Sequence, residues 1–384
     1  MEINKYLKSS AFKLTLSQKE DRLLPLFKEE HLYHYNNNNL YKKIIDNEYG
    51  SKNLFKSLET LPFIPVGYFK QSGKSFTSSN KIHRTLLSSS TSGTPSVIDI
   101  DNETSKRQIL SLTSSLSDFI GKKRIPFLIC DVPPEKANFE ISARHSAISG
   151  FSNFASKSDF ILKTYKDAFQ LDIRKVEEFI SNNSKEPLII CGFTYLIYIN
   201  LIKFCEQNKI VLKIPENSFL IHIGGWKKLA DQEISREKFI QNASDILNLK
   251  PKNIIDIYGF TEQMGTVYPE CEFGFKHVPD HAHLIVREPY SYENLEDGQI
   301  GVGQFLSLVP KSYAGFSLIT DDLVKIIGHD NCKCGRNGTY FKVIGRAKSA
   351  EIRGCGDVIA EKNMEKSYSI DNQDKATLYY FKSQ

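Results

Sequence analysis

The chain has 384 residues, of which 40% are hydrophobic and 25% are charged, and its formal net charge is +5. This composition is typical of a globular protein with a sizeable core and room for one large or two ordinary domains. The positive charge forms no basic stripe, so we expect no nucleic-acid partner. No segment has the roughly 20 apolar residues of a transmembrane span, and the N-terminus lacks the apolar core of a signal peptide.

The seven cysteines are an odd number scattered through a long chain, unlike the disulfide framework of a secreted protein. We therefore expect a cytoplasmic protein with reduced thiols. Metal binding, catalysis and burial remain as roles for the cysteines. Cys130, Cys191 and Cys205 stand in apolar runs and are interpreted as buried hydrophobic residues, and His222 as a core histidine with its polar atoms satisfied.

The first eighty residues have the pattern of helices joined by loops, with a turn or loop expected at residues 36–39. From residue 97 to residue 258, short apolar runs alternate with segments of helix length. One helix is expected to end at Gly121, and another to be capped by Asp172. We expect strands at "SVIDID", "IPFLICDV", "DFIL", "PLIICGF", "SFLIHIGG" and "NIIDIYGF". This alternation predicts an α/β fold with a largely parallel sheet and ligands at the carboxyl ends of its strands.

After residue 280 the pattern changes to strands separated by turn residues, without helices between them. The expected strands are "HLIVREP", "GQFLSLV" and "FSLITDDLVKII". They predict a β-rich subdomain, either an antiparallel barrel or a meander.

A hydroxyl-rich tract, "SSSTSGTPS" at residues 88–96, precedes one of the expected strands. Backbone amides in a turn, together with hydroxyl groups, can surround an anion such as a phosphate. A solvated turn or a flexible linker is the alternative interpretation.

Three further motifs place polar groups beside expected strands. "DIYGFTEQ" puts Glu262 just after a strand end, where it could hold a divalent cation that bridges phosphate oxygens, although an ordinary strand exit has the same pattern. "LITDDL" offers Asp321 and Asp322 as acceptors for ribose hydroxyls, and "VIGRAKS" offers Arg346 as a donor.

In their order and approximate spacing, these motifs resemble the adenylate-forming (acyl-AMP) ligase superfamily. More narrowly, "SARHSAISGFSNF", "LIHIGGWKKL", "YGFTEQMGTVYPECEFGFKH", "SYAGFSLITDDL" and "AEIRGCGD" resemble the acyl-protein synthetases of the LuxE type. The resemblance implies the large N-terminal adenylation domain of that superfamily over residues 1–345, with parallel-rich sheets layered with helices and a β-rich subdomain. It also implies a short C-terminal segment, residues 346–384, in place of the usual mobile domain.

The resemblance further implies an enzyme that uses ATP and Mg²⁺ to convert a carboxylic acid, expected to be a fatty acid, into an acyl-AMP. Glu262 would bind Mg²⁺ and act in catalysis with Thr261. The residues implied to bind ATP are Ser89, Thr91, Ser92, Gly93 and Thr94 at the phosphates, Gly225, Tyr258, Gly259 and Thr261 at adenine and the α-phosphate, and Asp322 with Arg346 at the ribose. The sequence departs from the superfamily at Ser90, where a glycine is usual, and at Ser96, where a lysine is frequent.

The resemblance also implies that a thiolate displaces AMP and that the acyl group then passes to a reductase or a carrier protein. Cys355 in "IRGCGDV" is the expected nucleophile, with glycines on both sides and Arg353 nearby to favour the thiolate. A structural cysteine in a tight turn is the alternative. Two rival functions remain: an acyl-CoA or carrier-protein ligase in lipid or surface-polysaccharide modification, and a non-catalytic scaffold with the same fold.

Two other cysteine motifs stand in the β-rich region. "CEFGFKH" contains Cys271 and His277, and "NCKCGRNG" contains Cys332 and Cys334. Three thiolates and one imidazole suit a closed tetrahedral zinc site. The sequence therefore predicts a structural Zn²⁺ that holds two loops together.

Overall fold

The computed structural model describes residues 3–50, 55–72, 76–88, 95–133, 147–148, 150–166, 168–226 and 234–347. They divide into two compact units. The first consists of Met1–Ser111, Phe260–Thr266 and His277–Gln384, and the second of Leu112–Gly259 and Val267–Lys276. The predicted phosphate-binding residues Ser89, Thr91, Ser92, Gly93 and Thr94 and the predicted nucleophile Cys355 lie outside the described residues.

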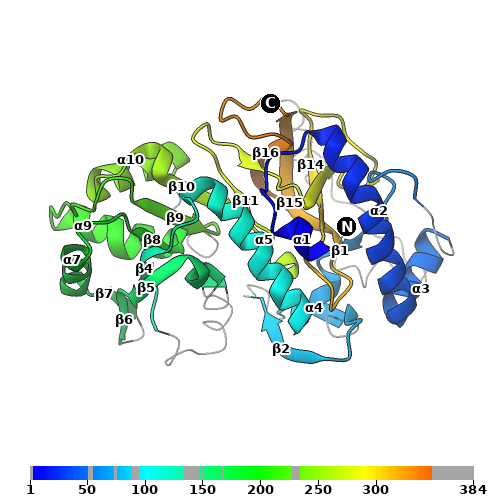
Figure 1. The fold of residues 1–384 in the computed structure, drawn as a ribbon, viewed down its shortest axis with the longest axis horizontal. Coiled ribbons are helices and arrows are strands. Elements are labelled where there is room, and N and C mark those ends of the chain that lie inside the picture. Colours follow the sequence, from blue (N-terminus) through cyan, green and yellow to red (C-terminus); the bar gives the residue numbers. More distant parts are fainter. Residues whose placement is uncertain are drawn as a thin grey trace, which may run out of the picture. The chain divides into compact units, whose positions relative to one another are not determined.

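The second unit is built on a six-stranded sheet in the order β11-β10-β9-β8-β4-β5 (Figure 1). Neighbouring strands from β10 to β5 run parallel, and only the edge strand β11 is antiparallel to its neighbour. The strands are β4 (Ile125–Cys130), β5 (Ala155–Phe160), β8 (Ile189–Phe193), β9 (Phe219–Ile223), β10 (Ile254–Tyr258) and β11 (Tyr268–Pro269). The predicted largely parallel sheet is confirmed, but the first expected strand, "SVIDID", does not belong to it. That segment forms β3 (Val97–Asp101), which pairs antiparallel with β2 (Ile82–Leu87) in a separate two-stranded sheet.

Alternate residues of these strands enter two separate apolar cores because successive side chains of a strand point to opposite faces. Leu128, Ile190 and Leu220 belong to one core, whereas Ile129, Cys191 and Ile221 belong to the other. Both faces of the sheet are therefore covered, as parallel sheets require.

The helices of the second unit include α7 (Ile173–Asn182), which begins after Asp172. The Asp172 Oδ1 accepts the backbone N–H of Lys175 at 3.3 Å. This is the predicted cap, and Val176 and Ile180 of α7 are buried. The other elements of this unit are η3 (Ser152–Phe154), β6 (Leu162–Tyr165), β7 (Ala168–Leu171), α8 (Thr194–Leu196), η4 (Ile197–Ile202), α9 (Lys203–Gln207), α10 (Arg236–Leu247) and η6 (Pro251–Asn253).

The first unit contains a mostly antiparallel sheet in the order β12-β16-β15-β14-β13, with β1 added parallel to β15. The strands are β1 (Ile64–Pro65), β12 (Lys276–His277), β13 (Ala282–Arg287), β14 (Ile300–Ser307), β15 (Ser317–His329) and β16 (Thr339–Arg346). The β-rich region predicted after residue 280 is thus a meander.

Helices precede this sheet in the chain and share its core, in which Phe27 and Phe316 stack with ring centroids 6.3 Å apart. They are α1 (Ile3–Leu7), α2 (Leu16–Asn37), α3 (Asn39–Glu48), α4 (Tyr68–Ser72) and the first half of α5 (Asn102–Ile120). From Leu112 onward α5 belongs to the second unit, and it ends at Gly121 as predicted. The loop expected at residues 36–39 is shorter than predicted, since α2 and α3 are separated only by Asn38. The Asn38 side chain accepts the backbone N–H of Tyr41 at 2.7 Å and so begins a new helix at once.

A two-stranded antiparallel hairpin, β2 (Ile82–Leu87) with β3 (Val97–Asp101), carries the hydroxyl-rich tract between its strands. Among the described residues, no helix is both long enough and apolar enough to span a lipid bilayer.

Candidate active site

The base of the hydroxyl-rich loop is held by two serines. The Ser88 backbone N–H donates to the Ser96 carbonyl at 3.0 Å, and the Ser96 N–H donates to Ser88 Oγ at 2.8 Å. In β3, the Asp99 carboxylate accepts hydrogen bonds from the hydroxyls of Thr77 at 3.1 Å and Thr85 at 2.7 Å. The ends of the loop are therefore fixed by polar contacts on both strands.

Glu262 is joined to the base of this loop. The chain leaves β10 at Gly259 and enters the short 3₁₀ turn η7 (Thr261–Gln263). Ser96 Oγ donates to Glu262 Oε1 at 2.5 Å, across 166 positions of sequence. Ser96 is fully buried, and Glu262 is 8% exposed. The contact brings two of the motifs found in the sequence together within one unit.

The backbone of η7 is held by buried side chains of the first unit. The Tyr313 hydroxyl donates to the Glu262 carbonyl at 2.8 Å. Gln263 Nε2 donates to the carbonyls of Phe305 and Gly315, each at 2.9 Å. These bonds satisfy the Glu262 carbonyl and the amide N–H groups of the Gln263 side chain, and they hold the turn that carries Glu262 in place.

Burial raises the pKa of Glu262, and the hydrogen bond from Ser96 partly offsets that rise. A buried carboxylate beside hydroxyl oxygens is a set of hard oxygen donors, which fits Mg²⁺ better than a softer metal. A cation would also compensate the negative charge that the protein buries here.

Asp322 and Arg346 face each other across β15 and β16, with their Cα atoms in register. The guanidinium, however, pairs with the neighbouring Asp321, Nη2 to Oδ2 at 3.3 Å. Burial raises the pKa of Asp321, and Arg346 lowers it. The two residues predicted to bind ribose therefore lie opposite each other on neighbouring strands, and Arg346 forms an ion pair with Asp321, the residue before Asp322.

In the second unit, the other predicted residues lie at strand ends. Tyr258 is the last residue of β10, and Gly225 follows the end of β9 and is exposed. Strands β9 and β10 are parallel, and Ile257 is in register with Ile223. Gly225 and Tyr258 therefore both lie at the carboxyl ends of these strands. The next residue, Trp226, is buried and packs edge-on against Tyr198, with centroids 5.2 Å apart.

Beside β10 lies a charge cluster that sequence reasoning missed. Lys276 Nζ donates to Asp256 Oδ2 at 2.6 Å and to Glu270 Oε2 at 3.2 Å, and Arg236 also pairs with Glu270. Burial opposes charge on Asp256, but Lys276 and His222 outweigh it and lower its pKa. The signal in the sequence was an aspartate within the apolar strand "NIIDIY".

His222 contacts this cluster, with Nδ1 2.9 Å from the Thr194 hydroxyl and 3.5 Å from Asp256 Oδ1. Burial lowers its pKa. The prediction of a satisfied core histidine is confirmed.

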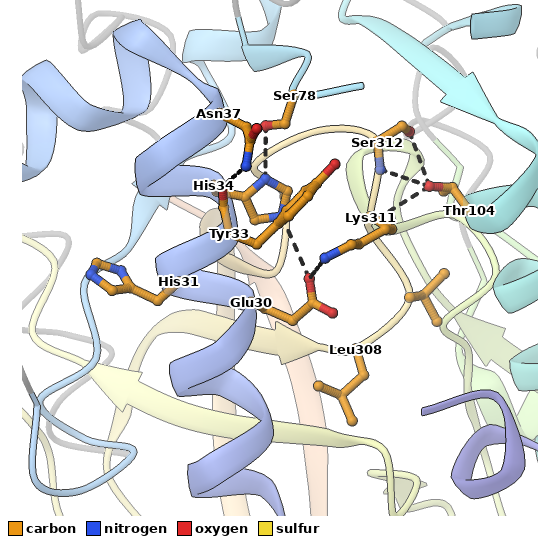
Figure 2. Close-up of polar contacts among 12 residues, drawn as sticks. Glu30, His31, Tyr33, His34, Asn37, Ser78, Thr104, Leu308, Lys311 and Ser312 are labelled. Atoms are coloured by element: carbon orange, nitrogen blue, oxygen red, sulfur yellow. Dashed lines mark hydrogen bonds and ion pairs between the residues drawn. The ribbon is translucent and has the colours of Figure 1, made fainter. Parts of the chain in front are cut away.

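A second buried charge cluster joins three segments of the first unit, and Figure 2 shows two of its members, Glu30 and Lys311. Glu30 of α2 is paired with Arg107 of α5 at 2.9 Å and with Lys311 at 3.2 Å. Lys311 Nζ also lies over the Tyr33 ring, 3.2 Å from its centroid. Glu30 is 1% exposed, so its charge is compensated almost entirely by protein groups.

The loop that contains Lys311 is fastened to the hairpin that carries the hydroxyl-rich tract. Ser312 Oγ donates to the Asp99 carbonyl at 2.8 Å, and the Ser312 carbonyl accepts the Ser78 N–H at 2.7 Å. Thr104 Oγ1 accepts the Ser312 N–H at 2.8 Å (Figure 2). The charge cluster thus holds the Lys311 loop, and that loop holds the β2–β3 hairpin through Ser312.

The cysteines among the described residues fall into two groups. Cys130, Cys191 and Cys205 are fully buried, and burial raises their thiol pKa values, for Cys205 to about 11. They are the apolar core residues that the sequence predicted. The ligand atoms of Cys271, His277, Cys332 and Cys334 instead lie within 4.8 Å of one another.

Comparisons with known proteins agree with these motifs. The chain is 24% identical over 333 residues to a long-chain-fatty-acid–luciferin-component ligase of Aliivibrio fischeri, covering 86% of this chain and 85% of that protein. A protein of the same name from Vibrio harveyi is 22% identical over 342 residues, covering 89% and 88%.

The fold resembles a crystal structure of 2-hydroxyisobutyryl-CoA ligase in an open conformation with 2-HIB-AMP and CoA. The TM-score is 0.66 at 15% identity, and the match covers 88% of this chain and 77% of that one. The family model described as acyl-protein synthetase, LuxE, matches residues 2–364. The chain therefore belongs to the LuxE acyl-protein synthetase family.

Proposed function

We propose that this chain activates a carboxylic acid, a long-chain fatty acid, with ATP as the acyl-AMP and then transfers the acyl group to a protein thiol. The observation that carries the proposal is the Ser96–Glu262 hydrogen bond, which joins the hydroxyl-rich loop to the carboxylate of "YGFTE". The two curated relatives are named as fatty-acid ligases, which supports the choice of substrate.

In the first step, a carboxylate oxygen of the acid attacks the α-phosphorus of ATP, a new O–P bond forms, and pyrophosphate leaves. This step needs positioning and charge neutralisation more than proton transfer. Residues 89–94 would surround the β- and γ-phosphates, and Asp322 would accept from the ribose hydroxyls. Tyr258, Gly259 and Thr261 would line adenine and the α-phosphate. Mg²⁺, held by Glu262, would supply the neutralising charge.

Ser96 gives this site a particular requirement for a cation. The superfamily frequently has a lysine at this position, but here the hydroxyl donates its proton to Glu262. The phosphate loop therefore lacks one ammonium group, and the neighbouring carboxylate adds a negative charge. A divalent cation has to compensate both, which makes the proposed reaction strictly dependent on Mg²⁺.

In the second step, the thiolate of Cys355 attacks the acyl carbonyl, the C–O bond to AMP breaks, and a thioester forms. The acyl group would then pass to a reductase or a carrier protein. The description of the matching family, acyl-protein synthetase, supports a protein acceptor.

Fatty-acid-dependent ATP–pyrophosphate exchange tests the first step. Glu262→Gln is expected to lower the exchange rate about a hundredfold because it removes the proposed cation ligand. Glu178→Gln, on the exposed side of α7, is the control and is expected to leave the rate unchanged. Full exchange by Glu262→Gln would refute the assignment of Glu262. No exchange by the wild-type chain with any acid would favour a non-catalytic scaffold.

Thioester labelling tests the second step. Cys355→Ser is expected to retain pyrophosphate exchange and to lose hydroxylamine-sensitive labelling by radioactive fatty acid. Labelling at the wild-type level in this variant would refute Cys355 as the acceptor. Turnover that requires added CoA would instead identify an acyl-CoA ligase.

A further inference from the structure

In the part of the chain that the structure describes, three cysteines from two turns and one histidine from β12 converge. The ligand atoms of Cys271, His277, Cys332 and Cys334 all lie within 4.8 Å of one another. In tetrahedral zinc sites, Zn–S bonds of about 2.3 Å and Zn–N bonds of about 2.0 Å set the ligand atoms roughly 3.7 Å apart. Small side-chain rotations would therefore let these four atoms enclose one ion.

The two turns that supply the cysteines have the same design. In Cys271–Gly274, the glycine N–H donates to the cysteine carbonyl at 2.9 Å, and in Cys332–Gly335 the same bond is also 2.9 Å. Both glycines adopt left-handed conformations, with φ of +78° and +80°. Such turns direct successive backbone amides toward one point, which favours an anion such as a thiolate. The two turns are thus each suited to hold a metal-bound cysteine.

The histidine is already oriented toward this point. His277 Nε2 lies 3.3 Å from Cys334 Sγ, close to the spacing of two ligands that share an ion. The ring stacks on Tyr340, with centroids 5.8 Å apart, and Phe12 meets its edge at 6.0 Å. His277, Cys271 and Cys332 are at most 7% exposed, and Cys334 is half-buried, so most of the cluster is shielded from water.

We propose that Cys271, His277, Cys332 and Cys334 bind one structural Zn²⁺. Three thiols would release their protons to solvent as three Zn–S bonds form, and a neutral imidazole would supply the fourth bond. A complete set of four protein ligands leaves no position for a substrate, so the ion has a structural role. Thiolate sulfur with imidazole favours zinc over magnesium or calcium, which prefer oxygen.

The ion would stabilise the connection between β15 and β16, which also holds the start of the chain. In that connection, Asp330 accepts the backbone N–H of Leu16 at 3.1 Å, and Asn337 Nδ2 donates to the Lys13 carbonyl at 2.9 Å. Loss of the ion is therefore expected to loosen the segment before α2 as well as the two turns.

Metal analysis of the full chain, purified without a metal-affinity column, tests the proposal. We expect about one zinc per chain, released when a mercurial reagent titrates the thiols. Replacement by Co²⁺ should give thiolate charge-transfer bands together with the visible bands of tetrahedral cobalt. Less than about a tenth of an equivalent of zinc, with no uptake when zinc is added, would overturn the proposal. Absence of the cobalt bands would also overturn it.

The double variant Cys332→Ser/Cys334→Ser is expected to lose the ion and to melt at a lower temperature than the wild type. Cys205→Ser, a buried cysteine outside the cluster, is the control and should keep a full equivalent of zinc. A full equivalent in the double variant would place the metal elsewhere and refute the assignment. If the double variant does not fold, the cobalt spectrum of the wild type decides. Pyrophosphate exchange is measured separately, so loss of zinc is distinguished from loss of the proposed activity.

Discussion

At the scale of single residues, Glu262 combines a cost in stability with a proposed role in function. Its carboxylate is 8% exposed, and burial raises its pKa; Asp321 adds to the rise, whereas Ser96 and Lys70 oppose it. A carboxyl whose folded pKa is raised favours the folded state below its unfolded pKa. That contribution is lost as the pH rises through the folded pKa. Ionisation of Glu262, which the proposed cation binding requires, therefore costs stability.

Glu262→Gln is consequently expected to have opposite effects on stability and activity. The amide oxygen can still accept from Ser96, and the buried charge is gone, so the melting temperature at neutral pH should stay the same or rise. The exchange rate should fall. Thermal denaturation at neutral pH measures the first effect, and a clear fall in melting temperature would show that the charge itself stabilises the fold.

Ser96→Ala is expected to shift the pH dependence of activity. Removal of the hydroxyl donor takes away an interaction that lowers the pKa of Glu262, so that pKa should rise further. If cation binding needs the ionised carboxylate, the acid side of the exchange–pH profile moves to higher pH. Ser88→Ala, at the other side of the loop base, is the comparison. The Ser88 hydroxyl accepts a hydrogen bond from the Ser96 backbone N–H and donates none to Glu262 in the described contacts, so this variant should leave the profile unshifted. An unshifted profile in Ser96→Ala would contradict the coupling.

At the scale of elements, the cluster of Glu30, Arg107 and Lys311 holds α2, α5 and the loop before β15 together. Buried ion pairs add little net stability, but removing one partner leaves an uncompensated buried charge. Because Ser312 in the same loop binds the β2–β3 hairpin, this cluster also positions the base of the hydroxyl-rich tract.

Glu30→Gln is therefore expected to lower the free energy of unfolding by about 3 kcal/mol, since both cations lose a buried counter-charge. Glu29→Gln, exposed on the same helix, is the matched control and should change it by less than about 0.5 kcal/mol. Denaturant titration measures both. Adding Lys311→Met to Glu30→Gln should recover part of the loss, and equal stability of Glu30→Gln and Glu29→Gln would contradict this account.

At the scale of the whole molecule, buried histidines predict how stability responds to acid. Burial lowers the pKa of His31 to about 4 and those of His281 and His283 to about 3, and it holds that of His34 well below its usual range. A histidine with a depressed folded pKa favours folding above its unfolded pKa of about 6.5, and that stability is lost as the pH falls below it. Nearby Lys311, Arg107 and Lys19 strengthen the effect.

The melting temperature is accordingly expected to fall between pH 6.5 and pH 4, with each such histidine contributing up to about 1.4 kcal/mol per pH unit. Thermal denaturation over this range measures the fall. His31→Gln keeps a hydrogen-bonding group beside Tyr41 and should flatten part of it. A melting temperature independent of pH in this window would contradict the buried, neutral state of these rings.

Sequence reasoning predicted the order of strands and the change from parallel sheet to meander because both depend on local periodicity. It also singled out Glu262 and the four residues of the proposed zinc site, since glycines and rare residue types mark the segments that contain them. The Glu30 cluster was missed because its partners are far apart in the chain, and the Lys276 cluster because the pairing of its charges depends on how separate segments pack. Likewise, only the three-dimensional structure shows that Arg346 pairs with Asp321 and that Ser96 donates to Glu262.

The most direct test of the central claim is the intact mass of the full chain after incubation with ATP, Mg²⁺ and a long-chain fatty acid. An ATP-dependent gain equal to one acyl group, reversed by hydroxylamine and accompanied by release of AMP and pyrophosphate, is the predicted result. An unchanged mass with no release of AMP or pyrophosphate would contradict it.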